Sequence, residues 1–206
     1  MSGWILALHS STPVLGAAVL HLDDPVGSRR VLVRPGGREL TNSLPVAVQE
    51  LLPASHWNEL VRLGVAIGPG GFTGTRLTVV MARTLAQQLG CPLDPVSSFA
   101  LMATRLHAAG SLIDSVAPFW IVQDLPRRGQ VAGLYQCQGD GSVTELERPH
   151  LLKDGQTAVP ALPMVDDVEA DVSRLLDLSL QAHRRGDPGP WEAVLPIYPT
   201  SPVGQV

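Results

Sequence analysis

The sequence predicts an α/β protein built on mixed sheets, with two successive strand-and-helix units. Short apolar runs alternate along the chain with segments in which apolar residues recur at helical spacing. The first two runs, Trp4–Leu8 and Val14–Leu20, are joined by a Ser/Thr/Pro turn, which is typical of a β-hairpin. A later apolar run, Leu63–Ile67, leads through a glycine-rich turn into a helical pattern. The first sheet is therefore expected to begin with antiparallel strands.

The composition fits one large domain or two small ones and excludes several classes of protein. The chain has 206 residues, of which 45% are apolar and 17% charged, so wholesale disorder is excluded. A net charge of −4 disfavours nucleic-acid binding through a basic face. The two cysteines form no CxxC pair, the first residues lack the basic segment of a secretory signal, and no apolar run approaches the roughly 20 residues that span a bilayer. We expect a soluble, cytoplasmic protein.

Proline, glycine and hydroxyl residues mark the ends of the elements in the first half. A third strand is expected at 31–33. It is followed by a helix with Pro45 in its first turn and one apolar face, formed by Leu44, Ala47, Val48, Leu51 and Leu52. The helix after the glycine-rich turn should continue to about Leu89, where Gly90 and Pro92 stop it. A strand at 93–96 and a helix capped by Ser97 complete this half.

The second half is less regular. Strands are predicted at 116–122, 131–137 and 143–146. Residues 154–163 are expected to form a loop, 168–185 a helix, and the proline-rich tail from Gly186 an extended segment. The small-residue break at Ala109–Gly110 is the best domain boundary, and it divides the chain into units 1–109 and 110–206.

The glycine-rich turn, Gly68 to Arg76, has two interpretations. Backbone N–H groups in such a turn, at the start of a helix, can approach a phosphate. The turn matches no standard phosphate motif, however, because Thr73 stands where GxGxxG requires glycine and the turn has no lysine. The alternative is a tight turn whose glycines allow close packing of the helix and the strand.

The helix after this turn carries more apolar surface than one buried face needs. Arg76, Arg83 and Gln87 form a polar stripe, whereas the apolar residues cover roughly 200° of the circumference, compared with about 100° for a single face. The second face is covered either by the neighbouring helix at 44–52 or by another protein chain, and the pattern leaves both open.

Other chemistry is weakly indicated. Ser10, Ser11 and Thr12, beside His9, offer hydroxyls that could face a phosphate, although such hydroxyls more often stabilise the turn itself. No two histidines are spaced to form a paired metal site on a helix, and the chain has no GxSxG nucleophile motif.

Several segments resemble the bacterial tRNA threonylcarbamoyladenosine biosynthesis proteins of the TsaB/YeaZ family. Residues 5–12 are similar to that family's ILALDTST, residues 68–76 to its GPGSFTGLR, and residues 95–98 to its GVSSL. Residues 124–127 and 196–198 resemble its DARxGEVY and PVYLR segments more loosely. The specific matches cover residues 4 to about 100.

The resemblance implies an actin-like, RNase H-like fold of two related α/β units, the second shortened. It also implies a non-catalytic scaffold. The family is the companion of the larger homologue TsaD and acts with the ATPase TsaE in transferring threonylcarbamoyl to a tRNA adenosine. The implied partners are a TsaD-type homologue, a TsaE-type ATPase or a second copy, with tRNA reached only through the complex and no membrane.

The resemblance also implies two sets of residues. Pairing through the helix that follows the turn implies a partner interface at Gly70, Gly71, Phe72, Thr73, Arg76, Leu77, Val80 and Met81. A vestigial nucleotide site is implied at His9, Ser10, Ser11 and Thr12. No catalytic residue, metal or cofactor of the chain's own is expected, and ATP or ADP is left open at the partner interface.

One departure from the family pattern bears on catalysis. His9 stands where the family has aspartate, and a neutral imidazole cannot supply the anionic hydrogen-bonding network that organises a metal and nucleotide in related ATPases. The HxxxH metal pair of the TsaD-type homologue is absent as well. Two alternatives are therefore disfavoured: an ATP-dependent phosphotransferase of the actin-like class, which needs those carboxylates, and a glycoprotease-like metalloenzyme, which needs metal ligands.

Overall fold

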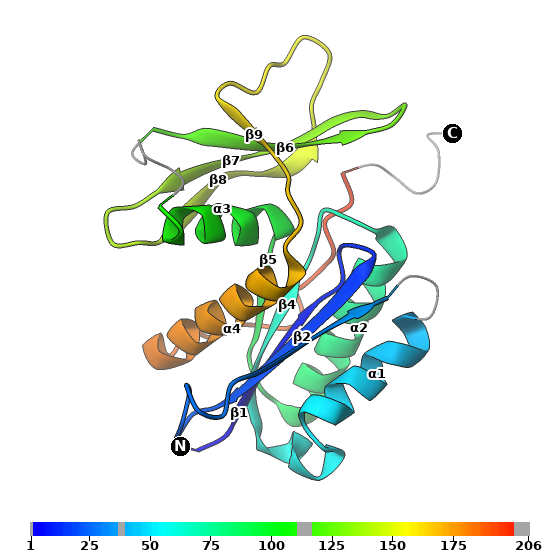
Figure 1. The fold of residues 1–206 in the computed structure, drawn as a ribbon, viewed down its shortest axis with the longest axis vertical. Coiled ribbons are helices and arrows are strands. Elements are labelled where there is room, and N and C mark those ends of the chain that lie inside the picture. The colour runs from blue at the N-terminus through cyan, green and yellow to red at the C-terminus, as the bar shows by residue number, and fades with distance from the viewer. Residues whose placement is uncertain (1, 37–39, 111–116, 200–206) are drawn as a thin grey trace.

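The computed structural model describes residues 2–36, 40–110 and 117–199 and contains two mixed sheets (Figure 1). The first has five strands in the order β3-β2-β1-β4-β5, and the second has four in the order β8-β7-β6-β9. No helix in the described ranges is both long enough and apolar enough to cross a membrane.

The first sheet combines a hairpin with parallel strands. Its strands are β1 (Trp4–His9), β2 (Val14–His21), β3 (Arg30–Pro35), β4 (Leu60–Ala66) and β5 (Leu93–Val96). β1 pairs with β2 in antiparallel register, and β4 runs parallel to both β1 and β5. The loops after β1 and β4 therefore lie at the same edge of the sheet.

Helices cover both faces of this sheet. Along β1, Leu6 and Leu8 enter one core with α1 (Leu40–Leu51) and α2 (Phe72–Leu89), whereas Ile5 and Ala7 enter another with α4 (Val168–Arg185). Alternate residues of one strand thus hold two helical layers on opposite faces, as Figure 1 shows.

The second sheet repeats the connectivity of the first with one strand fewer. Its strands are β6 (Phe119–Leu125), β7 (Gly129–Cys137), β8 (Val143–Leu151) and β9 (Ala161–Pro163). β6 and β7 form an antiparallel hairpin, β8 continues it, and β9 pairs in parallel with β6, which is the arrangement of β1, β2, β3 and β4. The second unit is therefore a shortened relative of the first.

The helix that follows each sheet in the chain packs against the sheet of the other unit. α3 (Ser98–Ala108), which follows the first sheet, packs through Phe99 and Met102 against the second sheet. α4, which follows the second sheet, packs on the first at very short range, because an added Cβ at Gly64 would lie 2.4 Å from Ser179 Oγ. The predicted boundary at Ala109–Gly110 stays a prediction, and the packing crosses it twice.

Buried polar contacts join the units. Arg105 on α3 donates from Nε to Asp171 on α4 at 2.8 Å, and burial raises the pKa of that carboxyl to about 6. At the other end of α3, Ser97 Oγ lies 2.8 Å from a carboxylate oxygen of Glu145 and 3.1 Å from Tyr135 Oη. These contacts fix the second sheet relative to the first.

A C-terminal strap, which we define as residues 187–199, runs from α4 past the outer edge of β5 to the glycine-rich turn. Leu93 N–H donates to Gly189 O at 2.8 Å, and Ile197 N–H donates to Ile67 O at 2.7 Å. Beneath the strap, the buried Arg62 side chain donates twice to Asp94 at 2.7 Å and once to the backbone carbonyl of residue 187 at 2.9 Å. The strap therefore adds a backbone hydrogen bond to the outer edge of β5 and a carbonyl partner for Arg62.

The structure differs from the predicted elements at several points, among them the bounds of β6 and β8, which end at Leu125 and Leu151 instead of residues 122 and 146. α1 begins at Leu40, so Pro45 lies inside the helix and not in its first turn, because Leu40 and Leu44 are both buried on the sheet side. A short 3-10 helix, η2 (Ala54–Glu59), precedes β4. Residues 161–163 form β9 within the segment expected to be a loop. The predicted extended tail lies in the strap as far as residue 199, and its remainder lies outside the described residues.

Candidate functional site

The hairpin turn after β1 and the glycine-rich turn after β4 are in direct backbone contact. Gly71 N–H donates to Ser11 O at 2.6 Å. An added Cβ at Gly70 would lie 2.0 Å from Ser11 O, and one at Gly74 would lie 2.3 Å from Ser10 O. Glycine is required at positions 70 and 74 because the two backbones approach closely. This agrees with the interpretation of residues 68–76 as a tight turn whose glycines allow close packing.

Two of the three hairpin hydroxyls are engaged within the protein. Ser10 Oγ donates to Gly74 O at 2.8 Å and contacts Thr78 Oγ1. Thr12 Oγ1 accepts from the N–H of Val14 at 3.0 Å, which stabilises the turn. The Ser11 hydroxyl is buried and has no partner among the described residues.

His9 ends β1 directly beneath this turn. Its side chain is fully buried, and neither ring nitrogen has a hydrogen-bond partner among the described residues. Burial lowers the pKa of the imidazole to about 4, so the ring is neutral at neutral pH. A neutral, buried imidazole cannot supply the negative charge that a carboxylate at this position would offer to a bound cation.

A cavity of about 680 Å³ opens between the two sheets at this edge. The first unit lines it with the hairpin turn, the glycine-rich turn and the start of α3, and the second with Gln123, Leu125 and the β6–β7 turn. Its charged lining residues among those described are Arg128 and Asp166. Tyr198 of the strap completes the wall beside Phe72, with ring centroids 4.8 Å apart.

The predicted partner-interface residues lie on the start of α2 and the turn before it. Gly70, Gly71, Phe72, Thr73, Arg76 and Val80 are exposed. Phe72 and Val80 are 39% and 54% exposed. Leu77 and Met81 are half-buried and pack against the first core, to which α1 contributes. The apolar arc of α2 therefore packs on this chain's own first core, and its outer members Leu77, Met81, Leu85 and Leu89 stay partly exposed.

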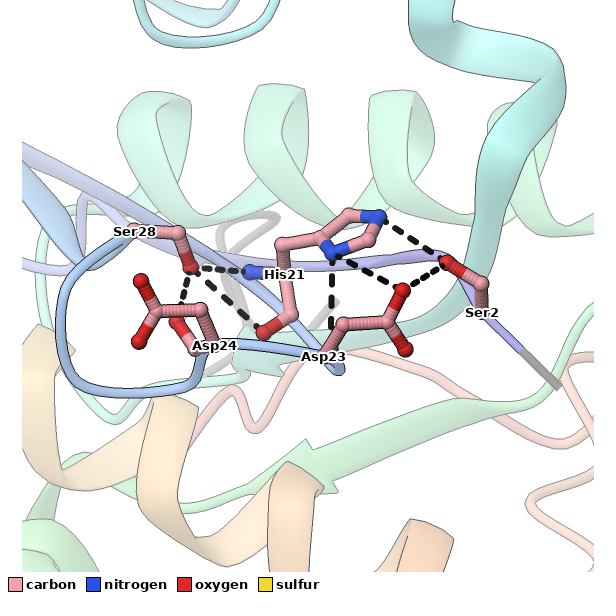
Figure 2. A network of polar contacts seen from close by, with 5 residues as sticks. All are labelled: Ser2, His21, Asp23, Asp24 and Ser28. Carbon is pink, nitrogen blue, oxygen red and sulfur yellow. Dashed lines mark hydrogen bonds and ion pairs between the residues drawn. The ribbon is translucent and has the colours of Figure 1, made fainter.

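A Ser-His-Asp cluster lies at the opposite end of the first sheet, and Figure 2 shows its contacts. Ser2 Oγ donates to Asp23 at 2.7 Å and lies 3.2 Å from His21 Nε2, while the Asp23 N–H donates to His21 Nδ1 at 3.4 Å. The serine proton therefore goes to the carboxylate, and Nδ1 acts as an acceptor. This is the reverse of the arrangement in which histidine activates a serine.

Metal ligands do not gather elsewhere in the part of the chain that the structure describes. It contains no group of three or more His, Cys, Asp or Glu side chains that could hold a metal ion.

Half of the cavity wall was not expected from the sequence. Gln123 and Met164 come from separated segments and carry no local motif. Asp166 belongs to an acidic cluster with Asp167, and Asp167 caps α4 by accepting from the Ala170 N–H. Ser98, Leu125 and Tyr198 lie within segments that resemble family motifs, and those resemblances were the signal available for this wall.

Sequence comparison relates the chain to two linked groups of proteins. Residues 30–118 match the family model described as TsaD, tRNA N6-adenosine threonylcarbamoyltransferase. The tRNA threonylcarbamoyladenosine biosynthesis protein TsaB of Bacillus subtilis (strain 168) is 33% identical over 141 residues, which are 64% of this chain and 55% of that protein. The chain thus matches about half the length of that relative.

Structural comparison agrees with this. A Pseudomonas aeruginosa protein with similarity to peptidase YeaZ has a TM-score of 0.74 at 23% identity, over 96% of this chain and all of that chain. YeaZ from Pseudomonas aeruginosa has a TM-score of 0.70 at 23% identity, over 95% and 99%. The expected α/β fold with two mixed sheets is confirmed, and the chain shares it with these two proteins.

Gly70→Ala is expected to lower the free energy of unfolding by about 2–3 kcal/mol. The added methyl group would clash with the Ser11 backbone carbonyl, and backbone cannot move aside as a flexible side chain can. Gly71→Ala is the matched control, since its nearest contact would be an ordinary 3.7 Å and its φ of −58° suits alanine. Urea denaturation followed by tryptophan fluorescence would measure both. Equal stability of the two variants would contradict the proposed steric constraint.

His9→Leu is expected to make the free energy of unfolding depend less on pH below about pH 6.5. The unfolded chain binds a proton at His9 near pH 6.5 and the folded chain only near pH 4, so acid favours unfolding over this interval. As the pH falls from 6.5 to 4, the unmodified chain should lose about 3 kcal/mol more than the variant, with the shift converted at 1.36 kcal/mol per unit. Urea titrations at pH 7, 5.5 and 4 would test this, and parallel profiles would exclude it.

Proposed function

We propose that the chain is a member of the TsaB/YeaZ family and a non-catalytic scaffold subunit in threonylcarbamoyl modification of tRNA adenosine. Its partners in this proposal are a TsaD-type homologue, which it activates, and a TsaE-type ATPase. The observation that carries the proposal is the exposed apolar start of α2, beside turns whose polar groups are largely engaged within the chain.

The exposed face supports pairing with another chain. Phe72 and Val80 are eight positions apart, which places them on the same side of α2, and Arg76 lies between them. A partner that covers these side chains would remove apolar area from water, which favours association. The same surface would serve a TsaD-type homologue or a second copy, and the two pairings would then exclude each other.

The absence of chemistry of its own is part of the proposal. A neutral, buried His9 offers neither a carboxylate for Mg²⁺ nor a base in contact with a ligand. Ser10 and Thr12 have their hydroxyls engaged within the chain, and the Gly71 N–H donates to Ser11 O. The net charge of −4 supports tRNA contact through the partners.

Reconstitution tests the function. TsaD- and TsaE-type proteins, the adenylate-forming enzyme, tRNA, threonine, bicarbonate and ATP would be combined with and without this chain, and tRNA nucleosides would be quantified by mass spectrometry. Threonylcarbamoyladenosine is expected only in the presence of the chain. Modification that does not depend on the chain would reject the proposal and reopen the phosphotransferase and metalloenzyme alternatives.

Val80→Arg is expected to weaken pairing at least about tenfold, because it replaces an exposed apolar side chain of the proposed interface by a charged one. Its effect on the stability of the isolated chain should stay within about 0.5 kcal/mol, since the side chain is exposed. Met81→Arg is the poorer test, because Met81 also packs against the core. Gln88→Arg, exposed on the last turn of the same helix, is the matched control. Co-purification and light scattering would detect pairing, and unaltered pairing of Val80→Arg would show that the face is wrong.

A further inference from the structure

The exposed start of α2 carries positive charge that this chain does not balance. Arg76 is exposed and has no hydrogen-bond or ion-pair partner among the described residues. The 18 residues of α2 include two arginines and neither aspartate nor glutamate. The first residues of the helix have no side-chain cap either, so the positive end of the helix dipole adds to the same field. This end of α2 therefore attracts negative charge from outside the chain.

Apolar side chains surround Arg76. Phe72 and Val80 lie one helical turn before and after it, and both are exposed. The strap adds Tyr198, whose ring centroid lies 4.8 Å from that of Phe72. Burial raises the pKa of Tyr198 and the Arg76 guanidinium acts in the opposite direction, which places the phenol near the guanidinium. An ion pair formed among these side chains would lose water on binding and would be stronger than one at an open surface.

The second arginine of α2 is tied to this chain. Arg83 is half-buried, and its Nη2 donates to the backbone carbonyl of Glu192 in the strap at 3.4 Å. The strap thus runs beside α2 from Arg83 to the Phe72 ring, which Tyr198 contacts. Arg76 is therefore the unbalanced charge on the side of α2 that stays exposed.

A second copy of this chain is a poor match for that charge. The described residues of α1 and α2 hold one carboxylate, Glu50, which is paired with Arg34. A two-fold pairing about α2 would present the same patch from both copies, so one arginine-bearing surface would face another. Like charges brought together in an interface oppose association. Glu192 of the strap lies beside Arg83 of its own chain.

We propose that Arg76 pairs with a carboxylate of a different protein chain, and that this ion pair selects a heterologous partner over a second copy. The partner surface that fits has an aspartate or glutamate surrounded by apolar side chains, which cover Phe72, Val80 and Tyr198. The inference rests on the proposed function, which supplies a TsaD-type homologue as the other chain. Arg76 is then the specificity-determining residue of the interface, and the strap belongs to that interface through Tyr198.

Calorimetric titration of the full chain with the TsaD-type homologue tests the ion pair. Arg76→Gln should weaken binding about tenfold, and Arg76→Glu should weaken it further because two carboxylates would then meet. Arg76→Lys should retain most of the affinity, since it keeps the charge. Arg184→Gln, which removes an exposed arginine from the last turn of α4, is the matched control. The thermal midpoint of the isolated chain should not change in any variant at position 76, because Arg76 has no partner within the described residues.

Salt and self-association provide readouts that a purely structural role would not move. Affinity of the unmodified chain for the homologue should fall as ionic strength rises from about 50 to about 500 mM, and the affinity of Arg76→Gln should fall less. Sedimentation equilibrium of the chain alone should show self-association weaker than pairing with the homologue. Arg76→Gln should strengthen self-association, because it removes the repulsion between copies.

Two results would overturn the proposal. One is unchanged affinity for the homologue in both Arg76→Gln and Arg76→Glu. The other is self-association that is tighter than pairing with the homologue and is lost in both Arg76→Gln and Glu192→Gln, which would make a second copy the occupant.

Reconstitution of tRNA modification separates this failure from failure of the proposed function. Modification that requires the chain but proceeds equally with Arg76→Glu would reject the present inference alone. Pairing that depends on Arg76, together with modification that does not require the chain, would reject the proposed function alone.

Discussion

The backbone contact between the hairpin turn at residues 10–12 and the glycine-rich turn at residues 68–71 fixes the geometry of one whole end of the molecule. The turns meet because they follow the neighbouring parallel strands β1 and β4. Glycine at position 70 lets the chains approach until one turn donates directly to the other. The Ser98 N–H extends the contact to α3, and α3 carries the second sheet. The placement of both units thus depends on a backbone contact so close that no side chain fits between the two turns.

This contact also explains why the site has the character of a binding surface. In the hairpin, Ser10 and Thr12 use their hydroxyls to hold the turns in place. Beside these turns, Phe72 is exposed at the start of α2 and contacts the Tyr198 ring. Phe72 also lines the cavity. A partner on the start of α2 would therefore touch a ring that forms part of the cavity wall.

The sequence predicted what local patterns control. The strands of the first sheet and the bounds of α4 follow from apolar spacing, caps and glycine stops. β9 could not be predicted, because it has three residues, ends in a proline and is defined by its pairing with β6. The start of α1 depends on burial of Leu40, which only the tertiary structure provides. The residues of the cavity wall could be predicted only in part for the same reason: its turns and Tyr198 lie in segments that resemble family motifs, whereas Gln123 and Met164 reach it only through the packing of distant segments.

The strap and α4 have a consequence for the order in which the chain can fold during synthesis. The first sheet is complete in sequence by Val96, yet one of its faces is covered by α4 and its outer edge by the strap. While the ribosome is still making the second sheet, Ile5 and Ala7 face solvent and the Arg62 guanidinium lacks its carbonyl partner from residue 187. We therefore expect the first unit to complete its core only after α4 and the strap have left the exit tunnel.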